Sequence, residues 1–139
     1  MEIVFESTED FNRSLARFSG PEQSIITDEV ERWVPLLLTD KGLRERRLHQ
    51  FFQFNLRNNY GSSLYSFIVN YYLRVILTID EDPLCDRLSI ALFEAVESRE
   101  AAAAYKRVGN SIYRTLLETS ESPKSKGRVD YDITVSSIG

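Results

Sequence analysis

The chain has 139 residues, of which 42% are hydrophobic and 27% charged, and its net charge is −4 at pH 7. This length fits one domain around a single core, and the composition excludes a fibrous or wholly disordered protein. The acidic balance provides no global field that would attract nucleic acid.

The expected compartment is the cytoplasm, with no membrane association. No apolar run approaches the roughly 18 residues of a membrane helix, and residues 1–6 lack the basic start and apolar core of a signal peptide. Cys85 has no partner cysteine, which is typical of a reducing compartment. The acids at 80–86 lack the spacing of a calcium loop, so we expect no metal and no cofactor.

The chain opens with a predicted strand followed by two predicted helices. Residues 2–6 are β-branched and aromatic, and Ser7 or Thr8 then suits a helix cap because acids fill the next turn. Gly20 is expected to end this helix, and Pro21 suits the first turn of the second. Each helix carries an apolar stripe: Phe11, Leu15 and Phe18, then Ile26, Val30, Trp33 and Leu37.

The second helix is expected to kink or end early at Pro35. Residues 41–57 then carry five bases against the single acid Glu45, a local basic patch on an acidic protein. The patch is either a phosphate-binding surface or a solvated helix or loop. Five candidate RNA-binding residues lie in this patch: Arg44, Arg46, Arg47, His49 and Arg57. A sixth, Ser66, lies on the next predicted strand.

The clearest pattern is a period of two in the neighbouring segments 63–69 and 72–80, which predicts a hairpin. Asn70 and Tyr71 suit the tight turn, because asparagine tolerates the left-handed conformation. One face of the second strand is fully apolar: Leu73, Val75, Leu77 and Ile79. If that face packs on the helices, Arg74 points to the open side of the sheet.

A further strand is expected over 87–96, followed by a closing helix over about 98–117 with Ser98 as its cap. The helix has a buried stripe: Ala101, Ala104, Tyr105, Val108, Ile112 and Leu116. Beyond it, 119–128 reads as a linker, and the alternation over 129–138 predicts a short strand that would pair with a sheet edge, its own or a second copy's in a homodimer.

The element order and the hairpin, Leu64-Tyr65-Ser66-Phe67-Ile68-Val69 followed by Tyr72-Leu73-Arg74-Val75-Ile76-Leu77-Thr78-Ile79-Asp80, resemble the RelE/ParE family of toxins from toxin–antitoxin pairs. Arg99 also stands six residues before Tyr105, much as an arginine and a tyrosine stand in RelE. The resemblance implies an α+β fold: a small antiparallel sheet packed on two N-terminal helices, with a C-terminal helix and an extra tail strand. The toxin-like domain would span 1–118, and 119–139 would form the linker and tail.

The resemblance also implies a translation inhibitor that binds the ribosome, cleaves mRNA without a metal, and is held inactive by a cognate antitoxin covering the open sheet face. Such endonucleases make the ribose 2′-hydroxyl attack the adjacent phosphate. Arg74 and Arg99 would stabilise the phosphorane charge and Tyr105 would stack on or orient the nucleotide. Each of these residues also has a structural alternative. Arg74 would form an ion pair with Asp80 or a neighbouring acid, Arg99 would form an exposed ion pair, and Tyr105 would simply pack against the sheet.

The sequence departs from RelE at one important place. RelE carries two lysines on the first hairpin strand, where this chain has Ser66 and Ile68, which cannot do the same acid–base work. His49 and the nearby arginines remain as candidate bases. The alternative is a non-catalytic binding module, either a ParE-type inhibitor of DNA gyrase or a degenerate toxin that acts through protein contacts.

Overall fold

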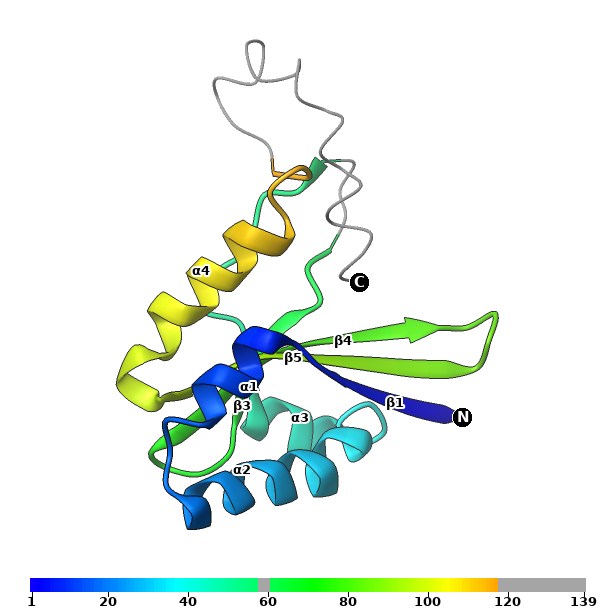
Figure 1. The fold of residues 1–139 in the computed structure, drawn as a ribbon. Coiled ribbons are helices and arrows are strands. Elements are labelled where there is room, and N and C mark those ends of the chain that lie inside the picture. Colours follow the sequence, from blue (N-terminus) through cyan, green and yellow to red (C-terminus); the bar gives the residue numbers. More distant parts are fainter. Residues whose placement is uncertain (58–60, 118–139) are drawn as a thin grey trace.

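The computed structural model describes residues 1–57 and 61–117, which form an α+β fold as expected (Figure 1). Five strands make one sheet in the order β1-β5-β4-β3-β2. No helix among the described residues is long and apolar enough to cross a membrane. The elements in chain order are β1 (Glu2–Ser7), α1 (Glu9–Leu15), α2 (Gly20–Trp33), a 3-10 turn (Val34–Leu36), α3 (Lys41–Arg47), β2 (Leu48–His49), β3 (Leu64–Ile68), β4 (Leu73–Asp82), β5 (Arg87–Glu97), a second 3-10 turn (Ser98–Glu100) and α4 (Ala101–Ile112).

The sheet is antiparallel except at one edge. β3, β4 and β5 pair antiparallel in turn, as expected, and β2, a strand that was not predicted, pairs antiparallel with β3. β1 pairs parallel with β5. The difference arises because the chain between β1 and β5 includes helices and the hairpin, so β5 can return beside β1 in the same direction. The expected tail strand lies outside the described residues.

Helices cover both faces of the sheet, and each face has its own apolar core (Figure 1). The first core joins α1, α2 and α3 to one face: Phe11, Ile26, Val30, Val34, Leu37 and Leu43 against Phe67, Val75, Leu77, Leu88 and Ile90. The second joins α4 to the other: Ala101, Ala104, Tyr105, Val108 and Ile112 against Leu64, Ile76, Ala91, Phe93 and Val96. The face expected to be open is therefore largely covered, because Leu64 and Ile76 must also be buried.

The N-terminal helices begin where capping predicts but divide differently. Thr8 caps α1 by accepting a hydrogen bond from the backbone N–H of Phe11, as expected. Gly20 does not end this helix: α1 ends at Leu15, and Gly20 is the first residue of α2. Ser19 forms a capping box with Glu22, and these paired hydrogen bonds place the helix start before the proline. α2 then ends ahead of Pro35, as expected.

Two turns use other chemistry than predicted. Asn70 does not adopt the left-handed conformation; its side-chain oxygen accepts hydrogen bonds from the backbone N–H groups of Tyr72 and Leu73, at 2.9 and 3.0 Å. Ser98 does not cap the closing helix, because it starts a 3-10 turn. Its backbone N–H instead donates to the carbonyl of Tyr72 at 2.7 Å, which fastens the start of the closing helix to the hairpin turn.

Candidate functional site

Arg74 lies at the turn end of β4, and its guanidinium is used by the hairpin itself. Its Nη1 donates to the carbonyl oxygens of Asn70 and of Leu73, the latter at 3.0 Å. Partial burial lowers the pKa of Arg74. No ion pair joins it to Asp80 or to another acid in the part of the chain that the structure describes. Arg74 therefore closes the hairpin turn.

Arg99 lies in the 3-10 turn before α4, with a side chain that is 82% exposed. Its Nε donates to Oε1 of Glu97 at 3.0 Å, the exposed ion pair that was one of the two alternatives. Leu73 pairs with Glu97 across β4 and β5. Arg74 and Arg99 therefore lie at the same end of the sheet, beside the hairpin turn.

Tyr105 is fully buried against the sheet. Its hydroxyl donates to the carbonyl of Leu64 at 3.0 Å, and burial raises its pKa to about 12. The ring centroids of Phe51, Phe52 and Phe54 lie 5.6, 5.4 and 5.7 Å from the centroid of the Tyr105 ring. The ring thus has no free face for a nucleotide, and packing describes its role in this structure.

Ser66, which stands where RelE has a lysine, is also buried. It is 1% exposed, and its hydroxyl has no hydrogen-bond partner among the described residues. The strand register places His49 directly opposite it, at the exposed edge of the sheet. The His49 ring packs edge-on against Phe51, with centroids 4.5 Å apart. Neither residue approaches Arg99 in the strand register, so the structure assembles no acid–base pair around it.

The basic window of 41–57 divides into structural and exposed arginines. Arg44 donates from Nη1 to the carbonyls of Leu37 and Leu38, at 3.3 and 3.4 Å, beyond the end of α2. Arg47 is held between α2 and the hairpin turn by hydrogen bonds to the carbonyls of Ile68 and Val69 and by an ion pair with Glu29. Arg57 follows Leu56, whose bridge to Leu117 ties this segment to the chain that follows α4.

Arg46 is exposed on α3 and makes no ion pair among the described residues. Arg44 and Arg47, on the same helix, direct their guanidinium groups to backbone carbonyls. The arginines of α3 therefore form no continuous basic surface: Arg46 is solvated, whereas Arg44 and Arg47 bond to the fold.

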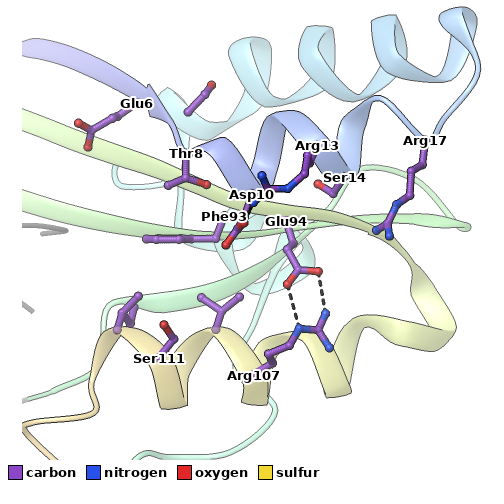
Figure 2. Close-up of a pocket in the computed structure, with 13 residues that line it drawn as sticks. Glu6, Thr8, Asp10, Arg13, Ser14, Arg17, Phe93, Glu94, Arg107 and Ser111 are labelled. Carbon is purple, nitrogen blue, oxygen red and sulfur yellow. Dashed lines mark hydrogen bonds and ion pairs between the residues drawn. The ribbon is translucent and has the colours of Figure 1, made fainter. Parts of the chain in front are cut away.

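A groove between α1 and α4 was not predicted from the sequence (Figure 2). One part has a volume of about 1050 Å³ and runs from the end of β1, at Ser7 and Thr8, to the last turn of α4. A neighbouring part of about 640 Å³ continues over the end of β5 towards Arg99. The two parts share Arg17, Glu94 and Arg107.

Glu94 and Arg107 cross the floor of this groove as an ion pair (Figure 2). The guanidinium donates twice to the carboxylate, at 3.1 and 2.7 Å, and the Glu94 side chain is 15% exposed. The hydrogen bond with Glu94 raises the pKa of Arg107. A β-bulge in β5 makes this possible, because the register shift leaves Phe93 unpaired and brings Phe93 and Glu94 together on the α4 face.

Arg17 is the free cation of the groove. It follows the end of α1, is exposed, and makes no ion pair among the described residues. Figure 2 shows its side chain reaching from α1 towards the groove floor. The described residues hold no group of three or more His, Cys, Asp or Glu that could bind a metal. The groove is thus suited to binding, with Arg17 available to an anionic group.

The sequence contained one signal for this groove. Glu94 is an acid within an otherwise apolar strand, and such a residue needs a partner when it is buried. Arg107 lies thirteen residues further on, and only the packing of α4 on β5 brings the two together.

Comparisons with known proteins identify one similar solved structure and no related sequence. No protein-family model and no curated protein matches the sequence. A crystal structure of the toxin–antitoxin complex RelBE2 from Mycobacterium tuberculosis is similar with a TM-score of 0.37 and 10% identity, over 70% of this chain and 99% of that one. This similarity is too low to assign a function to the chain.

Proposed function

We propose that this chain is a RelE/ParE-type toxin, partner to a cognate antitoxin, that acts through protein contact without cutting RNA. One observation carries the second half of the proposal: apart from Arg99, the residues at the positions resembling RelE's catalytic set are used by the fold. Tyr105 is buried and bonded to Leu64, Ser66 is buried, and Arg74 closes the hairpin turn.

Cleavage by a 2′-hydroxyl would need a base, an acid and a group that stabilises the phosphorane. Serine is a poor base, and Ser66 is not accessible. An arginine whose donors are held by backbone carbonyls has fewer left for phosphate oxygens, and Arg74 is in that position. Only Arg99 among the three expected catalytic residues is fully open to solvent.

The groove between α1 and α4 supports the binding half of the proposal. It combines apolar walls, such as Phe93 and Val108, with a few polar groups, the usual composition of a recognition site. Glu94 and Arg107 neutralise each other, so Arg17 is left to select an acidic or carbonyl-rich segment of the partner.

The proposal is tested by expressing the chain in a bacterial host and mapping mRNA ends by primer extension. We expect slowed growth without new mRNA ends. Arg17→Glu should weaken the growth effect, because it reverses the free charge of the groove, whereas Arg46→Glu, an equally exposed change on α3, should leave it unchanged.

Growth that is unaffected by the wild-type chain, at a level shown to be soluble and folded, would refute the toxin assignment. Equal loss with Arg17→Glu and Arg46→Glu would refute the groove as the acting surface. A gyrase supercoiling assay on the purified chain then separates a ParE-type inhibitor from a protein that acts on another target.

The second candidate is the ribosome-associated mRNA endonuclease. It is favoured by the position of Arg74 and Arg99 at one end of the sheet, where a phosphate could meet both. Primer extension in a translation extract decides between the two: cuts that require ribosomes and disappear with Arg99→Ala would establish the endonuclease. Their absence with the folded wild-type protein supports the binding module.

A further inference from the structure

β1 is an edge strand that the described residues leave uncovered. It pairs on one side with β5, and all six of its residues are exposed. Its central side chains Ile3, Val4 and Phe5 are apolar and are 38%, 37% and 37% exposed. Edge strands are commonly protected by lysine, proline, a bulge or a covering segment, and β1 has no lysine, proline or bulge.

The backbone hydrogen bonds show which groups of β1 face outward. The N–H and C=O groups of one residue point to the same side of a strand, and the side alternates along the chain. Glu2 and Thr8 donate to carbonyls of the β5 side, at 2.9 and 3.1 Å, so the even-numbered residues face β5. The N–H and C=O groups of Ile3, Phe5 and Ser7 therefore point away from the sheet.

The same outward residues lie beside the larger core. Ile3 pairs with Leu88 and Phe5 with Ile90, and both partners are buried in the core beneath α1 and α2. A strand added beyond β1 with apolar residues opposite Ile3 and Phe5 would extend this core and cover their exposed surface.

We propose that residues 129–138 of the same chain form this strand, paired antiparallel with β1. They lie outside the described residues, but their sequence alternates with a period of two, with one apolar face: Val129, Tyr131, Ile133 and Val135. The other edge strand, β2, has only two residues and is too short for this segment.

The chain can reach β1, and the nearer end of β1 favours one direction of pairing. The groove between α1 and α4 is lined by Ser7 and Thr8 from the end of β1 and by Ser111 and Ile112 from the end of α4, so these two ends are neighbours. The eleven residues of 118–128 can span up to about 35 Å when extended. A segment arriving at Ser7 and continuing towards Glu2 runs antiparallel to β1.

Charge also favours this direction. Three bases precede the tail strand: Lys124, Lys126 and Arg128. Glu6, near the end of β1 where the segment would arrive, is exposed and makes no ion pair among the described residues, whereas Glu2 at the other end pairs with Arg87. In the antiparallel arrangement the bases at the start of the segment would lie beside this unpaired acid.

The test is amide hydrogen exchange of the full chain, followed residue by residue by NMR. We expect the outward amides of Ile3, Phe5 and Ser7 to exchange slowly, as the amides of Val4 and Glu6 do through β5. Proline in place of Ile133 should speed exchange of the outward amides by at least about tenfold while Val4 and Glu6 stay protected.

Ser125→Pro is the matched control, because it places proline before the proposed strand and should change neither set of amides. Outward amides that exchange at the rate of an unstructured peptide in the wild-type chain would overturn the proposal. So would protection that survives Ile133→Pro, since another segment would then cover the edge. Light scattering should give the mass of one chain, and the mass of two would overturn pairing within the same chain.

Discussion

Replacing Arg47 by alanine should destabilise the fold strongly, although the residue lies in a stretch that reads as a solvated basic patch. Its Nη1 donates to the carbonyls of Ile68 and Val69 at 2.8 and 3.1 Å, and lies 3.4 Å from the carboxylate of Glu29. Its guanidinium also lies 5.1 Å from the centroid of the Trp33 ring. One side chain thus joins α2, α3 and the hairpin turn.

The expected loss follows from these contacts. Hydrogen bonds from a charged donor contribute about 1.5–3 kcal/mol, and a cation over a tryptophan ring about 0.5–1 kcal/mol at a partly exposed site. The side chains of Arg47 and Glu29 are both 23% exposed, so the loss is less screened than at the surface. We expect Arg47→Ala to lower the free energy of unfolding by about 2–4 kcal/mol. Lysine at this position cannot reproduce the planar fork and should recover only part of the loss.

The assay is urea unfolding followed by the fluorescence of Trp33, the only tryptophan in the chain. Arg46→Ala is the matched control, because Arg46 is the exposed neighbour on the same helix and should change stability by less than about 0.5 kcal/mol. If Arg47→Ala and Arg46→Ala unfold at the same urea concentration with unchanged m-values, the assigned role of Arg47 is wrong.

Two further substitutions test buried polar groups. Ser66→Ala removes a buried hydroxyl without a partner, so the free energy of unfolding should stay the same or rise by about 1 kcal/mol. A clear fall in this free energy, measured by urea unfolding, would instead show that the hydroxyl makes a hydrogen bond in the folded chain. Burial raises the pKa of Asp80, and a hydrogen bond with Ser63 opposes part of this shift. Asp80 therefore takes up its proton more readily in the folded chain, and its ionised form lowers stability at neutral pH, a cost that fades as the pH falls through the folded pKa. Asp80→Asn should therefore be more stable than the wild type at pH 7 and should lose that advantage towards about pH 4. Urea unfolding of both proteins at the two pH values measures the difference. An advantage that grows as the pH falls would contradict this reasoning.

Local patterns in the sequence determined the elements. Alternation over the hairpin predicted β3 and β4, and the stripe from Ala101 to Ile112 predicted the buried face of α4. Capping at Thr8 and the break before Pro35 were also readable, because these signals depend on neighbours within a few residues. The turn at Asn70 was located correctly but not its conformation, since the same residue supports a turn in two ways.

Tertiary packing decided what the polar residues do. Arg47 became a structural residue because α3 packs beside the hairpin turn. Phe51, Phe52 and Phe54, from the connection between β2 and β3, pack around the ring of Tyr105 and help to close it off from solvent. Gly109 shows the same dependence: a Cβ there would lie 1.9 Å from the ring of Phe54, a contact between residues far apart in the chain. The sequence by itself indicated most of the strands and helices, because their signals are local, but α3 and β2 were not predicted. Which charges and aromatic rings stay free for a partner was set by contacts between distant segments, which no local pattern encodes.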